Sequence, residues 1–174
     1  LDDLKGEEIS IFIKFSNYEK ILDDRANAIK LNYLKKPREV GARISYRGRE
    51  YKAKVRLKGD LPDHWLGGIR HSLRVKLSAG ETIFGFNEFS LHKPVSRQYP
   101  YEQAFQYSLR NAGNLAANHQ FLRVNVNGKD WGIMNIDENI SKVFLEKQGV
   151  KDSLVFRFGD DRRWLEYDRS LTDA

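Results

Sequence analysis

The sequence has no cysteine, one methionine and four prolines among its 174 residues. Without cysteine, a disulfide framework and a zinc site made of thiolates are both excluded. Long apolar runs are missing too, since no stretch approaches the roughly 18 apolar residues that a membrane-spanning helix needs. With 40% hydrophobic and 31% charged residues, the composition is typical of a globular domain and excludes an integral membrane protein with helical spans.

Several catalytic signatures are also missing. The chain contains no GxSxG element, no GxxxxGK[ST] phosphate loop and no GxGxxG after a strand, which argues against the commonest hydrolases, P-loop proteins and dinucleotide-binding proteins. Its four histidines show neither the i, i+4 spacing nor a nearby carboxylate pattern of a metal site. We therefore expect no histidine-based metal centre.

Positive charge is in excess. The chain has 30 Lys and Arg residues against 24 Asp and Glu residues, a formal net charge of +6. This excess favours an anionic partner, which could be a phosphate, a nucleic acid or an acidic protein. The length suits a single domain with a substantial core.

Hydrophobic periodicity predicts the elements. Alternating residues predict strands over residues 9–15, 72–77, 84–91, 121–126, 131–136 and 154–158, and two more within 42–58 around Arg47-Gly48-Arg49. Helical spacing predicts helices over residues 17–30, capped by Asn17, over 100–112, and after residue 139 up to Gly149. Asn127-Gly128 predicts a tight hairpin turn. Residues 59–71, rich in Gly, Pro and Asp, are expected to form a loop.

One face of the predicted sheet is strongly basic. Apolar residues of the strands around positions 53–57 and 73–77 alternate with cations that point the other way. These cations are Arg43, Arg47, Lys52, Lys54, Arg56, Lys58, Arg74 and Lys76. The face either binds an anion or is a charged surface that keeps the sheet soluble.

The order of elements resembles the small lobe of a protein kinase: a glycine-turned hairpin, a strand ending in Val-Lys, a helix, two antiparallel strands and an acidic residue. In that lobe a strand lysine pairs with the nucleotide phosphates and a helix glutamate holds the lysine. The resemblance makes Lys76 the phosphate lysine and Glu102 its partner. Alternatively, Glu102 is a surface acid near the start of its helix.

Local motifs make the resemblance more specific. The stretches VRLKGDLPDHW, RHSLRVKL and LRVNVNGKDWGIMNIDENISKVFL resemble the CotH family of atypical, spore-coat-type protein kinases, and the similarity covers residues 40–158. The family's Arg-x-Arg/Lys-Gly element corresponds to residues 56–59, its basic strand to 70–77 and its late hairpin to 124–138. Trp131 and Met134 replace usual tyrosines, and Arg70 replaces a common lysine. The family's W-D-x-D metal-binding motif has no counterpart, so Asp160 and Asp161 are interpreted as loop acids.

The resemblance implies an α+β fold: a mainly antiparallel twisted sheet with a few helices, like a kinase small lobe. It implies one domain over 1–174, the nucleotide-binding lobe of a larger kinase-like protein. Residues 1–38 would be a strand–helix extension, 40–158 the family-like region, and 159–174 the start of a missing lobe or a tail. The implied full-length activity is ATP-dependent phosphorylation of Ser/Thr in a protein substrate. The catalytic residues would lie outside this chain, which we expect to be inactive alone.

The resemblance also implies a ligand set. ATP would be bound with Mg²⁺, whose ligands are expected outside this chain, and the partners would be a protein substrate and the missing C-terminal lobe. The expected nucleotide-binding residues are Lys76, Arg74, Arg56, Lys58, Glu102, Glu138 and Arg157. Glu138 would bind the nucleotide, tie the lobes together, or be an acid in a helix's first turn. Arg157 lies near a position that is often basic in the family, or is an exposed charge.

Two other functions remain open. The basic face suits a module that binds nucleic acid or another polyanion, although few aromatics lie at its strand positions, which argues against nucleic acid. An inactive kinase-like scaffold is the third interpretation. The family resemblance favours a secreted or cell-envelope location, which the composition leaves open.

Overall fold

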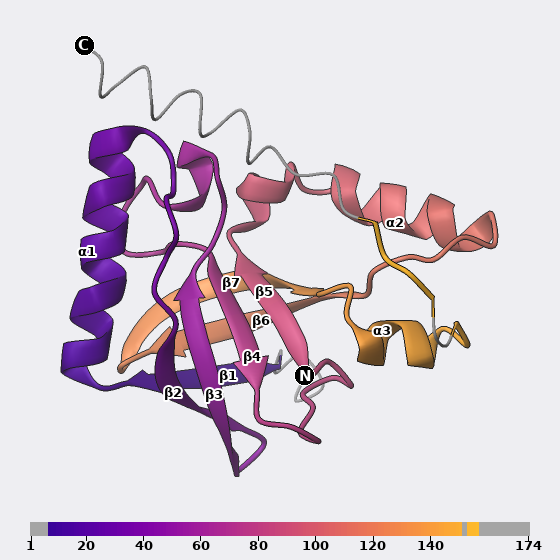
Figure 1. Ribbon diagram of the computed structural model, residues 1–174, viewed down its shortest axis with the longest axis horizontal. Coiled ribbons are helices and arrows are strands. Elements are labelled where there is room, and N and C mark those ends of the chain that lie inside the picture. Colours follow the sequence, from indigo (N-terminus) through magenta and orange to yellow (C-terminus); the bar gives the residue numbers. More distant parts are fainter. Residues whose placement is uncertain (1–6, 151–152, 157–174) are drawn as a thin grey trace, which may run out of the picture.

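Seven strands close into one barrel in the computed structural model, which describes residues 7–150 and 153–156 (Figure 1). The barrel order is β1-β2-β3-β4-β5-β7-β6. The strands are β1 (Glu8–Ile13), β2 (Val40–Tyr46), β3 (Arg49–Leu57), β4 (Leu73–Leu77), β5 (Glu88–His92), β6 (His119–Val126) and β7 (Lys129–Glu138).

The predicted fold class, an α+β protein with an antiparallel twisted sheet like a kinase small lobe, is therefore wrong. The sheet is mixed and closed, because β1 pairs antiparallel with β2 on one side and parallel with β6 on the other. The β1–β6 pairing brings Ile11 opposite Val126. Closure leaves every strand of the barrel with two neighbours, and few helices accompany it.

The alternating apolar residues fill the barrel interior. Side chains from successive strands lie there without solvent exposure, including Ile11, Ile44, Val55, Val75 and Leu91. Because successive strand residues face opposite sides, the polar residues between them point outward. The predicted inward and outward faces of β3 and β4 are thus confirmed.

The described residues form three α-helices outside the barrel: α1 (Phe15–Leu31), α2 (Tyr101–Asn111) and α3 (Lys142–Lys147). In Figure 1, α1 runs along one side of the barrel, and α2 and α3 lie on the opposite side. α1 packs on the barrel through buried Ile21 and Ala28. It begins after Lys14, so the predicted Asn17 cap is wrong; the Asn17 side chain instead donates to the Gly41 carbonyl at 3.1 Å.

The predicted helix after residue 100 is confirmed, but its apolar stripe is not buried. α2 has no buried residue, and Tyr101 and Phe105 are 72% and 58% exposed. α3 confirms the short helix before Gly149; its cap is Ser141, whose hydroxyl accepts from the Phe144 amide at 3.2 Å.

Both predicted hairpins are confirmed. Asn127 and Gly128 have φ values of 49° and 78°, and Arg47 and Gly48 have φ values of 48° and 75°. Two successive positive φ angles define the turn whose twist matches that of the strands. The tight Asn-Gly turn was predicted correctly.

Other boundaries differ. β5 begins four residues later than predicted, after a turn in which Ile83 and Phe86 form an isolated bridge. Residues 153–156 are not in a strand, and residues 157 and 158 lie outside the described part of the chain. Short 3₁₀ turns, η2 (Pro62–His64) and η3 (Pro94–Arg97), lie in the loops around β4 and β5. No helix among the described residues is long and apolar enough to cross a membrane.

Candidate anion-binding site

The cations predicted from the sequence gather on the outer face of β3 and β4. We call this surface the basic face and define it by Lys52, Lys54, Arg56, Lys58, Arg74 and Lys76. In the register of the two strands, Arg56 lies opposite Arg74 and Lys54 lies opposite Lys76. Like charges directly opposite each other destabilise a sheet, so the face has an electrostatic cost that a bound anion would relieve.

Lys76 lies in a pocket on this face. The pocket has a volume of about 360 Å³ and is lined by Glu39, Lys52, Ala53, Lys54, Lys76, Leu77 and Ser78. Glu39 pairs with Lys54 at 3.1 Å. Within the described residues, Lys52 and Lys76 form no ion pair, and Glu39 is the single acid that lines the pocket.

Arg74 has a different environment. Its guanidinium donates to Glu88 Oε1 at 2.8 Å, and the two side chains are only 11% and 23% exposed. Arg56, opposite Arg74, donates to the Leu57 carbonyl at 3.3 Å. The pairing with Glu88 fixes Arg74 in position, whereas the exposed Lys76 is free to reorient.

Lys58, just beyond β3, lies at one end of a buried hydrogen-bonded chain. Its ammonium is 3.2 Å from His92 Nε2, His92 Nδ1 is 3.2 Å from Ser72 Oγ, and Ser72 Oγ is 2.8 Å from His64 Nδ1. Burial, together with the charges of Lys58 and Arg97, holds the pKa of His92 far below its ordinary value. A neutral His92 accepts from Lys58 and so positions that cation.

Asp137 lies beside this chain on the outer face of β7. It accepts from His119 Nδ1 at 2.7 Å and from the Asn135 side chain, and Arg97 Nε is 3.4 Å from its second oxygen. His92 Nε2 lies 3.3 Å from that oxygen. Because the Lys58 ammonium can only donate and lies 3.2 Å from His92 Nε2, we assign the Nε2 lone pair to Lys58.

Sequence reasoning missed His92, Asp137 and Arg97. The histidines had been considered only as metal ligands, and the described residues contain no group of three His, Asp or Glu side chains able to hold a metal ion. The available signal was the strand sequence EFSLH, in which Ser90 and His92 alternate with apolar residues as outward-facing polar groups. Both are nevertheless buried, at 2% and 0% exposure, and His92 contacts Lys58, His64 and Ser72 of the segment between β3 and β4.

Glu138 is a buried, paired acid. Its carboxylate accepts from Lys147 Nζ and from Asn118 Nδ2, each at 2.6 Å, and its side chain is 2% exposed. It ends β7, three residues before the Ser141 cap of α3, so the interpretation as an acid in a helix's first turn is wrong. In this structure Glu138 ties β7 to α3.

Of the remaining predicted residues, only Glu102 lies in the described part of the chain, and it does not line the Lys76 pocket. Glu102, in the first turn of α2, accepts from the Gln106 side chain at 3.0 Å. No ion pair joins it to Lys76 in the described ranges. Arg157, Asp160 and Asp161 lie outside the described residues.

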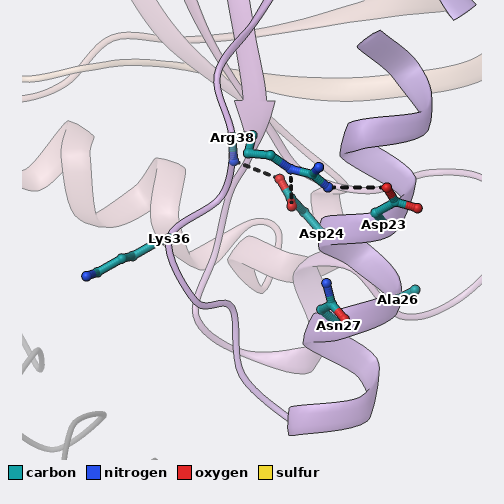
Figure 2. Close-up of a pocket in the computed structure, with 6 residues that line it drawn as sticks. All are labelled: Asp23, Asp24, Ala26, Asn27, Lys36 and Arg38. Atoms are coloured by element: carbon teal, nitrogen blue, oxygen red, sulfur yellow. Dashed lines mark hydrogen bonds and ion pairs between the residues drawn. The ribbon is translucent and has the colours of Figure 1, made fainter. Parts of the chain in front are cut away.

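A second charged pocket, between α1 and the segment before β2, is structural. Figure 2 shows the Arg38 guanidinium pointing toward Asp23 and Asp24, with Lys36 directed away from them. Arg38 Nε donates to Asp24 at 2.8 Å, and its backbone amide donates to the same carboxylate at 2.7 Å. These bonds occupy the acids and fasten α1 to the barrel.

The fold and the site together define a closed barrel with a basic outer face on β3 and β4, beside which lie the buried His92 and Asp137. The sequence matches the family model described as CotH kinase protein over residues 55–170. The chain belongs to the CotH kinase protein family. A sequence comparison with curated proteins gives no match.

Proposed function

We propose that this chain is the nucleotide-binding lobe of a CotH-type protein kinase. In the full-length protein it would position ATP for transfer of the γ-phosphoryl group to Ser or Thr of a protein substrate. Membership of the CotH kinase family supports the reaction class. The basic face supports the location of the phosphates.

The observation that carries the proposal is the pair of directly opposed like charges, Arg56 with Arg74 and Lys54 with Lys76. Arg74 and Lys54 already pair with Glu88 and Glu39, so a triphosphate over these two rows would mainly offset Arg56 and Lys76, which form no ion pair within the described residues. Phosphoryl transfer asks a protein mainly for positioning and charge neutralisation rather than for covalent chemistry. A strand surface supplies both, because its backbone is rigid.

The proposed roles follow the geometry. Lys76 binds phosphate in its pocket, Arg74 and Lys58 contribute cations whose positions are set by Glu88 and His92, and Arg56 adds charge. Glu138 lies where β7 leaves the barrel, and its ion pair with Lys147 holds β7 against α3. Glu102 remains the proposed partner of Lys76, and Arg157 remains a proposed contact to the nucleotide. Both contacts would form in the full-length protein. Mg²⁺ would take its ligands from outside this chain.

A thermal-shift titration with Mg-ATP tests the proposal. Saturation at 100 times the dissociation constant stabilises a protein by about 2.7 kcal/mol, which corresponds to a rise of about 5–10 °C for a domain of this size. Lys76→Ala should lose much of the shift, while Lys129→Ala, at an exposed position in the β6–β7 hairpin, should keep it. No shift in the parent, or an equal one in Lys76→Ala, would contradict the assigned role.

Two further assays, combined with the thermal shift, separate the other functions. Salt-sensitive duplex binding that is abolished by neutralising Arg56 and Arg74, with no effect of ATP on stability, would identify a polyanion-binding module instead. ATP binding without phosphoryl transfer by the full-length protein would identify an inactive scaffold.

A further inference from the structure

A second groove lies on the outer face of β1, β2 and β3. It has a volume of about 600 Å³ and is lined by Phe12, Ile13, Lys14, Asn17, Gly41, Ala42, Arg43, Lys52, Ala53 and Asn127. Lys52 and Ala53 also line the Lys76 pocket, so the groove and the proposed phosphate site are neighbours. Phe12, Lys14 and Asn17 precede residue 55, where the family match begins.

The groove exists because one outward position has no side chain. Phe12, Arg43 and Lys52 lie opposite one another in a single row across the three strands. In the next row, Gly41 lies opposite Lys54 and leaves the space open. Glycine within a strand often marks a place where another chain approaches closely.

The lining is complementary to an acidic, partly apolar ligand. Lys14, Arg43 and Lys52 are exposed, and none of the lining residues is acidic. Two acids lie beside the lining: Glu39 pairs with Lys54, opposite Gly41, at 3.1 Å, and Glu50 is 3.5 Å from Arg43 in a pair whose side chains are both at least 60% exposed. Such exposed pairs are worth little and are easily displaced. Phe12, 42% exposed, offers an apolar wall.

The mode of recognition is restricted by the barrel. β1, β2 and β3 each pair on both sides, so a peptide cannot add as a further strand there. It must be bound by side chains, and two amides are available for its backbone. Asn17 Oδ1 and Asn127 Nδ2 take part in no hydrogen bond within the described residues, whereas their other amide atoms bond Gly41 and Ile13.

We infer that this groove binds an acidic segment of a partner protein. An apolar side chain of the segment packs against Phe12 over Gly41, and its carboxylates pair with Arg43, Lys52 and Lys14. The inference rests on the proposed function only in identifying this partner as the phosphorylation substrate, docked beside the phosphate pocket.

Fluorescence anisotropy with a labelled peptide of alternating Glu and Leu tests the inference, with a Gln-for-Glu peptide as the control ligand. The groove-filling variant Gly41→Ile is the key reagent. A Cβ at Gly41 would meet only Asn17 Nδ2, at 3.9 Å, so the variant should fold, which its melting temperature checks. Gly41→Ile and Arg43→Gln should each weaken binding of the Glu peptide at least tenfold, while Lys129→Gln should not.

Three experimental results would contradict the inference. Equal binding of the Gln peptide, undiminished binding by Gly41→Ile, or competition by duplex DNA at the same affinity would overturn the inference. The Mg-ATP thermal shift of Gly41→Ile reports separately on the proposed function. If the parent protein shows no Mg-ATP thermal shift but still binds the Glu peptide, the proposed nucleotide site is refuted and the inferred peptide groove stands.

Discussion

Replacing Gly59, the glycine of the family's Arg-x-Lys-Gly element, should disrupt the loop that joins β3 to β4. Gly59 has φ +101°, and an added Cβ would lie 2.0 Å from His64 Cγ and 2.4 Å from His64 Cβ. Because these atoms are at the root of the imidazole, rotating the ring cannot clear them. Gly128 has φ +78° with nothing within 4 Å of an added Cβ, so it is a matched control.

The expected magnitude is the sum of three effects. A non-glycine residue at positive φ costs about 1–2 kcal/mol at either position. At Gly59 the displaced His64 also loses its 2.8 Å hydrogen bond to Ser72, which is worth about 1 kcal/mol. The strained packing around His64 adds about 1 kcal/mol. Gly59→Ala should therefore cost about 3–4 kcal/mol and Gly128→Ala about 1–2 kcal/mol.

Urea unfolding of both variants measures the difference directly. At about 2–4 °C per kcal/mol for a chain of this size, Gly59→Ala should also lower the melting temperature about twice as much as Gly128→Ala. Equal destabilisation by the two substitutions would refute the steric reasoning, because it would leave only the shared cost of positive φ.

Two further predictions concern buried ionisable groups. Glu138→Gln removes the charge from the bonds to Lys147 and Asn118 and should lower the free energy of unfolding in urea by about 1.5–3 kcal/mol. The control Glu146→Gln, in an exposed ion pair with Lys142, should change it by no more than about 0.5 kcal/mol. Similar losses in the two variants would contradict the buried pairing of Glu138. Burial lowers the pKa of His71 to about 3, below the value of roughly 6.5 in the unfolded chain, so its contribution is complete above pH 6.5 and is lost as the pH falls. Between pH 6.5 and 5 this loss is about 1.6 kcal/mol, and His71→Phe, which preserves the ring contact with Trp131, should show a correspondingly smaller decrease.

Local sequence chemistry predicted the turns and the faces of the strands. Asn127-Gly128 and Arg47-Gly48 adopt the positive φ angles that those residue types tolerate. The closed barrel was not predictable in the same way, since it depends on β1 pairing with β6 across more than a hundred residues. A period of two tells which side chains share a face but not which strands become neighbours.

The same distinction between local pattern and long-range contact applies to the candidate site. The cations of the basic face follow from alternation, and their cross-strand pairs follow once the register is known. The burial of His92 and Asp137 on the outside of the barrel depends on coverage by η3 and the loop after β3, which no local pattern encodes. The apolar stripe of α2 shows the opposite difference. Its spacing is typical of a buried helix face, but nothing in the described residues buries Tyr101 or Phe105.

Mapping of backbone amide shifts during an Mg-ATP titration tests the central claim most directly. The account predicts saturable changes that concentrate on β3 and β4 around Arg56, Arg74 and Lys76, with a second set where β7 ends at Glu138. Changes confined to other surfaces, or none at all at millimolar nucleotide, would contradict the nucleotide site on the basic face.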